Sequence, residues 1–336
     1  MSYGHDPRSA PHQRPDRRTF MVRRLFVLGL LVAVVYAAVS VGSGWFGDDA
    51  KPDGAITPVT NTVINDGRPP ATPFDIPATE PPLRPRTIPT KDNPAVVLIL
   101  GDSDAGGFGP YVQQAMQRTG VVRSKISYVT SSGLARPDYF DWPSNMRAVV
   151  PDVNPDVVIA TFGGNDAQGL RNPDKSWAVN HTPGSGGDDT DWRTEYGRRV
   201  GAAMDYLSKG NRTLIWVGIP DDDNPQNTAR LKVQDEVVRT EAAKRSGKVV
   251  FVDTWQLFAG PGGVWTPNAV DPRDGQSKAV RRSDGFHLND MGSQILAIPV
   301  FAAVVRDLQS RGATSLTVPT TVAPTTAPPA NTPPTT

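Results

Sequence analysis

Two residues of this sequence, Ser103 and His287, have the chemistry of a nucleophile and its base. Ser103 follows an unbroken apolar run and precedes a glycine-rich turn, which predicts a buried strand that delivers one hydroxyl to the edge of a sheet. A serine hydroxyl becomes a useful nucleophile only when an adjacent base takes its proton. His287 has Asp284 three residues before it, placed to hold the other ring nitrogen. These three residues predict acyl transfer through a serine nucleophile.

The tetrahedral intermediate of acyl transfer carries a negative oxygen, and the sequence offers hydrogen-bond donors for it. We predict that these donors are the backbone N–H groups of Ser103 and Gly133 and the side-chain amide of Asn165. Gly133 and Asn165 each follow a predicted strand. Because the carboxyl ends of parallel strands meet at one edge of a sheet, we expect these loops to converge.

Each of these stretches also has an ordinary structural interpretation. Ser103 or Asp104 is a suitable helix cap, and the run 163–166 (Gly-Gly-Asn-Asp) is typical of a turn. A single histidine such as His287 is more often structural than catalytic. The stretches occur together, in order and at the predicted ends of strands, and this combination favours the catalytic interpretation.

Four further residues are candidates for the wall of a pocket beside the serine: Asp104, Arg136, Trp142 and Asp166. For Trp142 the alternative is that its ring packs under the loop. His181 lies in the long loop 167–190 and has no acidic residue at a spacing that would indicate a catalytic pair, so we expect it to face solvent or to belong to a substrate lid. The acidic run 221–224 lacks the pattern of a calcium loop and predicts a solvated turn.

Residues 94–311 alternate apolar strands with helical patterns, which is typical of a largely parallel α/β layer fold. The strands are predicted from apolar runs that indicate burial on both faces, at 96–100, 126–130, 157–162, 214–218 and 249–252. The helices are predicted from periodicity and end signals, at 111–118, 191–207, 228–245 (capped by Asn227) and 291–309.

The four chemical stretches resemble the sequence blocks of the SGNH hydrolases, also called the GDSL esterase/lipase family. Ser103 is similar to the family nucleophile, Gly133 and Asn165 to its oxyanion-hole residues, and Asp284 and His287 to its Asp-x-x-His pair. The resemblance runs through the whole predicted domain. It implies a three-layer α/β/α sandwich, similar to flavodoxin, with a five-stranded and mostly parallel sheet. It also implies that no cofactor and no metal are required.

Two details refine this resemblance. The run 132–142 is similar to a bacterial subgroup of membrane-anchored or exported SGNH proteins. Asp104 departs from the family pattern, because the residue after the nucleophile is usually leucine or another neutral residue. A carboxylate at that position would disfavour anionic substrates.

The ends of the chain have compositions unsuited to a core. Residues 1–20 predict a disordered cytoplasmic leader, and residues 21–46 predict a transmembrane signal-anchor helix. Arginines before the apolar run and aspartates after it predict that the remainder lies outside the membrane. A cleaved signal peptide, removing residues 1 to about 40, is the alternative. Residues 47–93 predict a Pro/Thr-rich tether, and 312–336 a disordered Thr/Pro/Ala tail.

Composition excludes several classes of protein. The formal net charge is +1, and the candidate domain has no basic cluster with interleaved aromatics, so we expect no nucleic-acid partner. The chain has no cysteine, which excludes disulfides and thiolate metal sites.

These observations predict an extracytoplasmic, membrane-tethered serine esterase. The expected substrate is an acyl ester, most simply an acetyl ester, of a glycan or lipid of the cell envelope. Two alternatives share the same residues. An O-acyltransferase would resolve the acyl-enzyme with a sugar hydroxyl instead of water. A catalytically silent module would bind the envelope through the same loops.

Overall fold

The computed structural model describes residues 85 and 87–318. The predicted leader 1–20, the predicted membrane anchor 21–46, nearly all of the predicted tether 47–93 and most of the predicted tail 312–336 lie outside the described residues. These segments therefore stay predictions. The predicted domain 94–311 is described in full.

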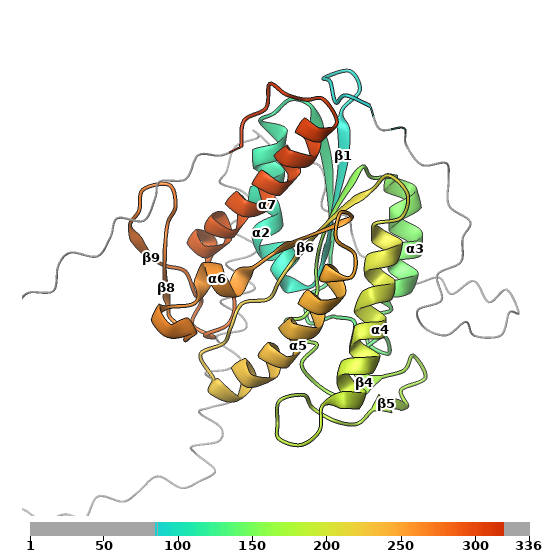
Figure 1. The fold of residues 1–336 in the computed structure, drawn as a ribbon, viewed down its shortest axis with the longest axis vertical. Helices are drawn as coiled ribbons and strands as arrows, with labels where there is room; N and C mark the ends of the chain where they lie inside the picture. Colours follow the sequence, from blue (N-terminus) through green and yellow to red (C-terminus); the bar gives the residue numbers. More distant parts are fainter. Residues whose placement is uncertain (1–84, 86, 319–336) are drawn as a thin grey trace, which may run out of the picture. The chain divides into compact units, whose positions relative to one another are not determined.

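A five-stranded parallel sheet forms the centre of the described domain, with the strand order β2-β1-β3-β6-β7 (Figure 1). The bounds of these strands are Ala95–Gly101 (β1), Val122–Tyr128 (β2), Val157–Thr161 (β3), Thr213–Val217 (β6) and Val249–Val252 (β7). Every residue of β1 is buried, as expected for a strand covered on both faces. The predicted parallel α/β fold is confirmed.

Helices cover both faces of this sheet (Figure 1). Their bounds are Ser103–Gln117 (α2) and Asp290–Ser310 (α7) on one face, and Trp142–Val153 (α3), Thr190–Leu207 (α4) and Pro225–Ala243 (α5) on the other. Alternate residues of β1 enter two separate cores, Leu98 and Leu100 with α3 to α5, Val97 and Ile99 with α2 and α7. Burying each such side chain contributes about 1.5–3 kcal/mol. The predicted three-layer sandwich is confirmed.

Several predicted boundaries were wrong. Strand β2 begins at Val122, four residues before the predicted 126–130. Helix α2 begins at Ser103, eight residues before the predicted 111–118, although its first turns contain three glycines. Glycine disfavours a helix by about 1 kcal/mol, and packing of these turns against the sheet and α7 overcomes that local preference. The side chain of Asn224 caps α5 by accepting from the N–H of Gln226, so the predicted cap Asn227 is wrong.

Other elements were not predicted from the sequence. Helix α3 begins with Trp142-Pro143 after the cap Asp141 and has Pro151 in its last turn, and this proline obscures the helical pattern. Two short hairpins pair Leu170–Arg171 (β4) with Trp177–Val179 (β5), and Asn268–Val270 (β8) with Ser277–Ala279 (β9). The short helices Thr254–Phe258 (α6) and Pro261–Gly263 (η2) precede β8.

Within the described residues, α7 is the one helix whose length and composition would allow it to cross a membrane. Its apolar window is 67% buried inside the domain, where Ile295, Val300 and Val304 belong to the core that also holds α2. This burial identifies α7 as a core helix of the sandwich.

Candidate active site

The hydroxyl of Ser103 is mounted where β1 turns into α2. Gly101 closes the strand with φ +154°, and a Cβ at this position would lie 2.1 Å from the carbonyl oxygen of Thr161 in β3. Asp102 then caps α2, since its carboxylate accepts from the N–H of Asp104 at 3.0 Å. Ser103 is the first residue of the helix. The cap is therefore Asp102, and the alternative in which Ser103 or Asp104 is the cap is wrong.

The loop before α7 brings a histidine to this serine. The Oγ of Ser103 and the Nε2 of His287 are 3.0 Å apart, although the two residues are 184 positions apart in sequence. The Nδ1 of His287 lies 2.8 Å from Oδ2 of Asp284. If Nδ1 carries the proton for this carboxylate, Nε2 is free to accept the proton of the serine hydroxyl.

Asp284 is held in position by its own loop. Its Oδ1 accepts from the backbone N–H of Phe286 at 3.1 Å and of His287 at 2.9 Å. Partial burial opposes the charged form, but the hydrogen bonds from the His287 ring and from the two backbone N–H groups prevail and lower the pKa of Asp284 below its ordinary value. The carboxylate is thus ionised at neutral pH and can stabilise a positively charged imidazole ring.

The predicted oxyanion residues lie on the loops after β2 and β3. The Nδ2 of Asn165 donates to the carbonyl oxygen of Ser132 at 3.2 Å, which joins the two loops beside Gly133. Ser103, Asn165 and His287 line one cavity of about 420 Å³. Gly133 is not among the described residues that line this cavity, so its N–H is the least directly placed of the three predicted donors.

Asp166 is fully buried, and the prediction that it lines a pocket is wrong. Its carboxylate accepts from the backbone N–H groups of Leu134 and Ala135 at 2.9 and 2.8 Å, and from the hydroxyl of Tyr196 at 2.9 Å. A Cβ on Gly133 would lie 2.0 Å from Oδ1 of Asp166. Asp166 therefore fixes the path of the loop after β2, and only glycine fits at position 133.

We expect Gly133→Ala to lower the free energy of unfolding by about 1–3 kcal/mol, because the new methyl group would clash with a carboxylate held by three hydrogen bonds. Thermal unfolding of the purified chain measures this loss. The control is Gly109→Ala in α2, whose Cβ would meet Ile99 and Ile126 at 3.4 Å, an ordinary contact. Equal stability of the two variants would contradict the role given to Asp166.

Trp142 and Arg136 do not contact the cavity as predicted. The Trp142 ring is fully buried, donates from Nε1 to the hydroxyl of Ser132 at 2.9 Å, and packs edge-on against Phe162. The alternative interpretation, in which Trp142 packs under the loop, is correct. Arg136 forms a bidentate pair with Asp138 at 2.8 Å and is not among the described residues that line the cavity at Ser103.

Asp104 does border the cavity, but as a buried carboxylate. Its side chain is 9% exposed, and its Oδ2 has no hydrogen-bond partner among the described residues. Burial raises the pKa of Asp104, against the nearby positive charges of Arg281 and Arg282. Burial and the charge of Asp104 raise the pKa of Asp102 well above its ordinary value. Two acidic side chains that resist ionisation thus flank the serine.

This pair contributes stability that increases as the pH falls from neutral. The folded protein holds protons on Asp102 and Asp104 more tightly than the unfolded chain, so the free energy of unfolding increases as pH falls through the raised pKa values. Thermal unfolding between pH 8 and 5 measures this slope, and Asp104→Asn should flatten it. Asp138→Asn is the control, since ion pairing lowers the pKa of Asp138. An unchanged slope in Asp104→Asn would contradict the prediction.

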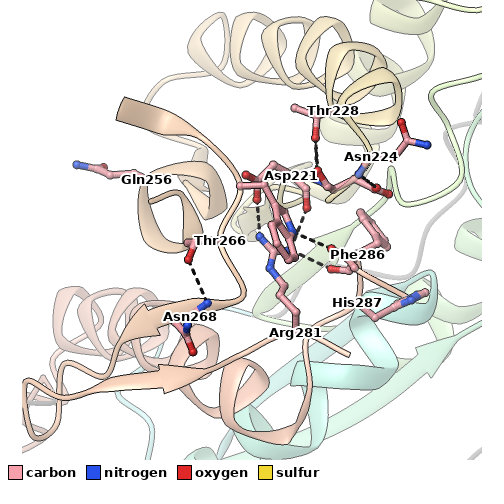
Figure 2. Close-up of polar contacts among 12 residues, drawn as sticks. Asp221, Asn224, Thr228, Gln256, Thr266, Asn268, Arg281, Phe286 and His287 are labelled. Carbon is pink, nitrogen blue, oxygen red and sulfur yellow. Dashed lines mark hydrogen bonds and ion pairs between the residues drawn. The ribbon is translucent and has the colours of Figure 1, made fainter. Parts of the chain in front are cut away.

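A buried ion pair that was not predicted supports the histidine loop (Figure 2). Arg281 donates from Nη1 to the carbonyl oxygens of Asp221 and Phe286, both at 2.9 Å, and from Nη2 to the Asp221 carboxylate. The two side chains are 2% and 1% exposed. The predicted solvated turn at 221–224 is therefore wrong at its first residue. No sequence spacing marks this pair, because its members are 60 positions apart.

His181 has an acidic partner, which the sequence analysis missed. Its Nε2 lies 2.7 Å from Oδ1 of Asp189, and the same carboxylate accepts from the N–H of Gly184. Asp189 thereby closes the loop before α4. Among the described residues, no group of three or more His, Cys, Asp or Glu side chains could hold a metal ion.

Comparison with known proteins gives one sequence family and several solved structures. The family described as "Protein of unknown function (DUF459)" matches residues 96–303. A comparison with curated proteins gave no match.

Three of the similar structures are a GDSL-like lipase and two esterases. A GDSL-like lipase from Bacteroides thetaiotaomicron is 14% identical, with a TM-score of 0.43 over 67% of this chain and 92% of its own. The psychrotrophic esterase EstA from a Pseudoalteromonas species is 10% identical, with a TM-score of 0.40 over 64% and 98%. An acetyl xylan esterase from Geobacillus stearothermophilus is 17% identical, with a TM-score of 0.41 over 64% and 94%.

Proposed function

This chain belongs to the DUF459 family, and we propose that it is a serine esterase whose nucleophile is Ser103. The observation that carries the proposal is the line of hydrogen bonds from Ser103 Oγ to His287 at 3.0 Å and from His287 to Asp284 at 2.8 Å. Both distances are within the reach required of a nucleophile, its base and the group that orients the base. The line ends in a cavity of about 420 Å³, large enough for a small ester.

In the first half-reaction the Oγ of Ser103 attacks the ester carbonyl carbon while Nε2 of His287 takes its proton. Asp284 stabilises the protonated ring. The N–H groups of Ser103 and Gly133 and the amide of Asn165 donate to the negative oxygen of the intermediate. When the intermediate collapses, the alcohol leaves with the proton from His287. Water, deprotonated by the same ring, then attacks the acyl-enzyme and releases the carboxylic acid.

The proposed substrate is an acylated, most simply acetylated, glycan or lipid of the cell envelope. This part of the proposal depends on the predicted anchor 21–46 and tether 47–93, which would hold the domain outside the membrane within reach of such material. The proposed localisation is therefore the cell membrane, with a single span and an extracytoplasmic domain.

Covalent labelling tests the proposed nucleophile. The full chain is treated with a fluorophosphonate probe, digested and analysed by mass spectrometry. We expect the label on the peptide that contains Ser103, and we expect prior incubation with the probe to abolish hydrolysis of phenyl acetate. A folded chain that takes up no label and hydrolyses no acetyl ester would overturn the esterase proposal in favour of a binding module.

A further inference from the structure

A second cavity, of about 300 Å³, borders the same two side chains, Asn165 and His287. It is bounded by residues 164–168 after β3, by helix α5 and by the loop 284–287. The polar and aromatic groups that line it include Gln168, Asp222, Asn227, Arg230 and Phe286. An ester has an acyl branch and an alcohol branch, and His287 must reach the oxygen of the alcohol branch to protonate it. A cavity on each side of His287 and Asn165 provides room for both.

Arg230 is the residue of the second cavity that most indicates a ligand. Within the described part of the chain it forms no ion pair, and its Nε is buried without a hydrogen-bond partner. A guanidinium group carries five N–H donors, and a buried donor without an acceptor costs about 1–3 kcal/mol. Oxygen atoms of a bound molecule would supply acceptors for the other N–H groups of Arg230, which lines the cavity and makes no hydrogen bond or ion pair within the described residues. An alkyl alcohol or a lipid tail would not.

The other groups in this cavity favour a neutral, hydroxyl-rich molecule. Asp222 is an acceptor that already holds the side chain of Asn227 at 3.3 Å and the N–H of Asn224 at 2.7 Å, and its negative charge opposes an anionic ligand beside Arg230. Sugar hydroxyls both donate and accept, so they can satisfy a cation and a carboxylate at once. The ring of Phe286 and the side chain of Leu231 offer the apolar contact that the C–H face of a sugar ring needs.

Contacts within the protein support the second cavity. The loop before α4 packs closely against the backbone of Ala229 and Arg230, since a Cβ on Gly184 would lie 2.6 Å from the carbonyl oxygen of Ala229 and 3.0 Å from Cα of Arg230. Asp189 holds that loop through the N–H of Gly184. Gln168, which lines this cavity, donates to the carbonyl oxygen of Asn165, the predicted oxyanion residue.

The first cavity suits the acyl branch. Gly106 and Gly107, in the first turns of α2, line it without side chains, and Phe108, Leu288 and Leu296 line its apolar part. Resting on the proposed esterase function, we propose that the second cavity binds the alcohol portion of the substrate, that this alcohol is a sugar, and that Arg230 determines the preference for it.

Two acetyl esters with different alcohols test this division. The full chain is assayed with monoacetylated methyl glucosides, which carry free hydroxyls, and with phenyl acetate, which carries none. We expect Arg230→Met to lower kcat/KM for the glucosides at least tenfold and to leave phenyl acetate hydrolysis within twofold of the original chain. Arg230→Lys should restore part of the loss, because a cation with three donors returns to the site.

Controls separate the possible results. Arg306→Met removes an exposed arginine of α7 that lines neither cavity and should change neither rate. Thermal unfolding shows whether the Arg230 variants remain folded. Equal losses on both esters, or no loss on the glucosides, would overturn the sugar assignment while phenyl acetate hydrolysis by the original chain still supported the esterase. Failure of the original chain to hydrolyse either ester or to take up the fluorophosphonate probe would instead remove the esterase premise.

Discussion

Ser103→Ala is expected to lower kcat for phenyl acetate by roughly four to six orders of magnitude, to the residual rate that binding and the oxyanion donors alone provide. His287→Ala is expected to cause a similar loss, because the imidazole of His287, 3.0 Å from the hydroxyl, is the base that hydrogen-bonds to Ser103 among the described residues. The double variant should lose little more than either single variant, since the two residues act as one unit. Steady-state kinetics on the four proteins measure all three expectations.

The matched control for Ser103 is Ser293→Ala. Ser293 lines the same cavity and is buried, but among the described residues it is the hydroxyl of Ser103, not that of Ser293, that hydrogen-bonds to His287. We expect its kcat to stay within a few-fold of the original. Losses that add up in the Ser103/His287 double variant would mean that the two side chains act independently, and a large loss in Ser293→Ala would mean that the nucleophile is misassigned.

The part of the site that could be predicted depends on local chemical signals at strand ends. Ser103 follows a strand visible as an apolar run, and the Asp284-His287 spacing allows one loop to hold both side chains of the pair. Ser103 follows the carboxyl end of β1, and the loop between β9 and α7 brings His287 to within 3.0 Å of it. The spacing of polar residues after apolar strands was therefore enough to predict the convergence that the structure shows.

The supporting contacts could not be predicted, because nothing local distinguishes them. Asp102 and Asp166 look like ordinary turn residues in the sequence, yet each is fully buried and accepts two backbone N–H groups from another loop. A tryptophan near the predicted site, such as Trp142, is a reasonable candidate for a pocket wall. Only the packing of α3 shows that its ring lies in the core. The tertiary structure determines which group pairs with a buried charge, and sequence spacing does not predict that partner.

The same reasoning applies to the first turns of α2. Gly106, Gly107 and Gly109 favour a loop by local propensity, yet a helix forms there, and at Gly106 it packs closely against β2. A Cβ on Gly106 would lie 2.6 Å from the ring of Tyr128 at the end of β2. Gly106 thus allows this close packing, and it lines the cavity beside Ser103 as well.

Arg281→Met is expected to lower the free energy of unfolding by about 3–5 kcal/mol, the largest stability loss that the described contacts predict. The substitution would leave Asp221, 1% exposed, without its cation, and would remove donors from the carbonyl oxygens of Asp221 and Phe286. Burial already raises the pKa of Asp221 despite the opposing effect of Arg281. Without Arg281 this carboxyl would have to take up a proton to stay buried. Chemical denaturation at pH 7 and pH 5 measures both effects, and the loss should be smaller at pH 5.

The double variant Asp221→Leu/Arg281→Met distinguishes the effect of the buried charge on stability from the effect of Arg281 on the position of the His287 loop. Removing both charges should recover much of the stability, because a buried pair can be replaced by apolar side chains at little cost. Arg281→Met should also lower ester hydrolysis, and the double variant should not recover it, because the carbonyl oxygen of Phe286, next to His287, would still lack its donor. Arg282→Met, at the exposed neighbour, should cost less than 1 kcal/mol. Recovery of both stability and activity in the double variant would show that Arg281 serves the fold alone, whereas recovery of stability without activity assigns it to the orientation of His287.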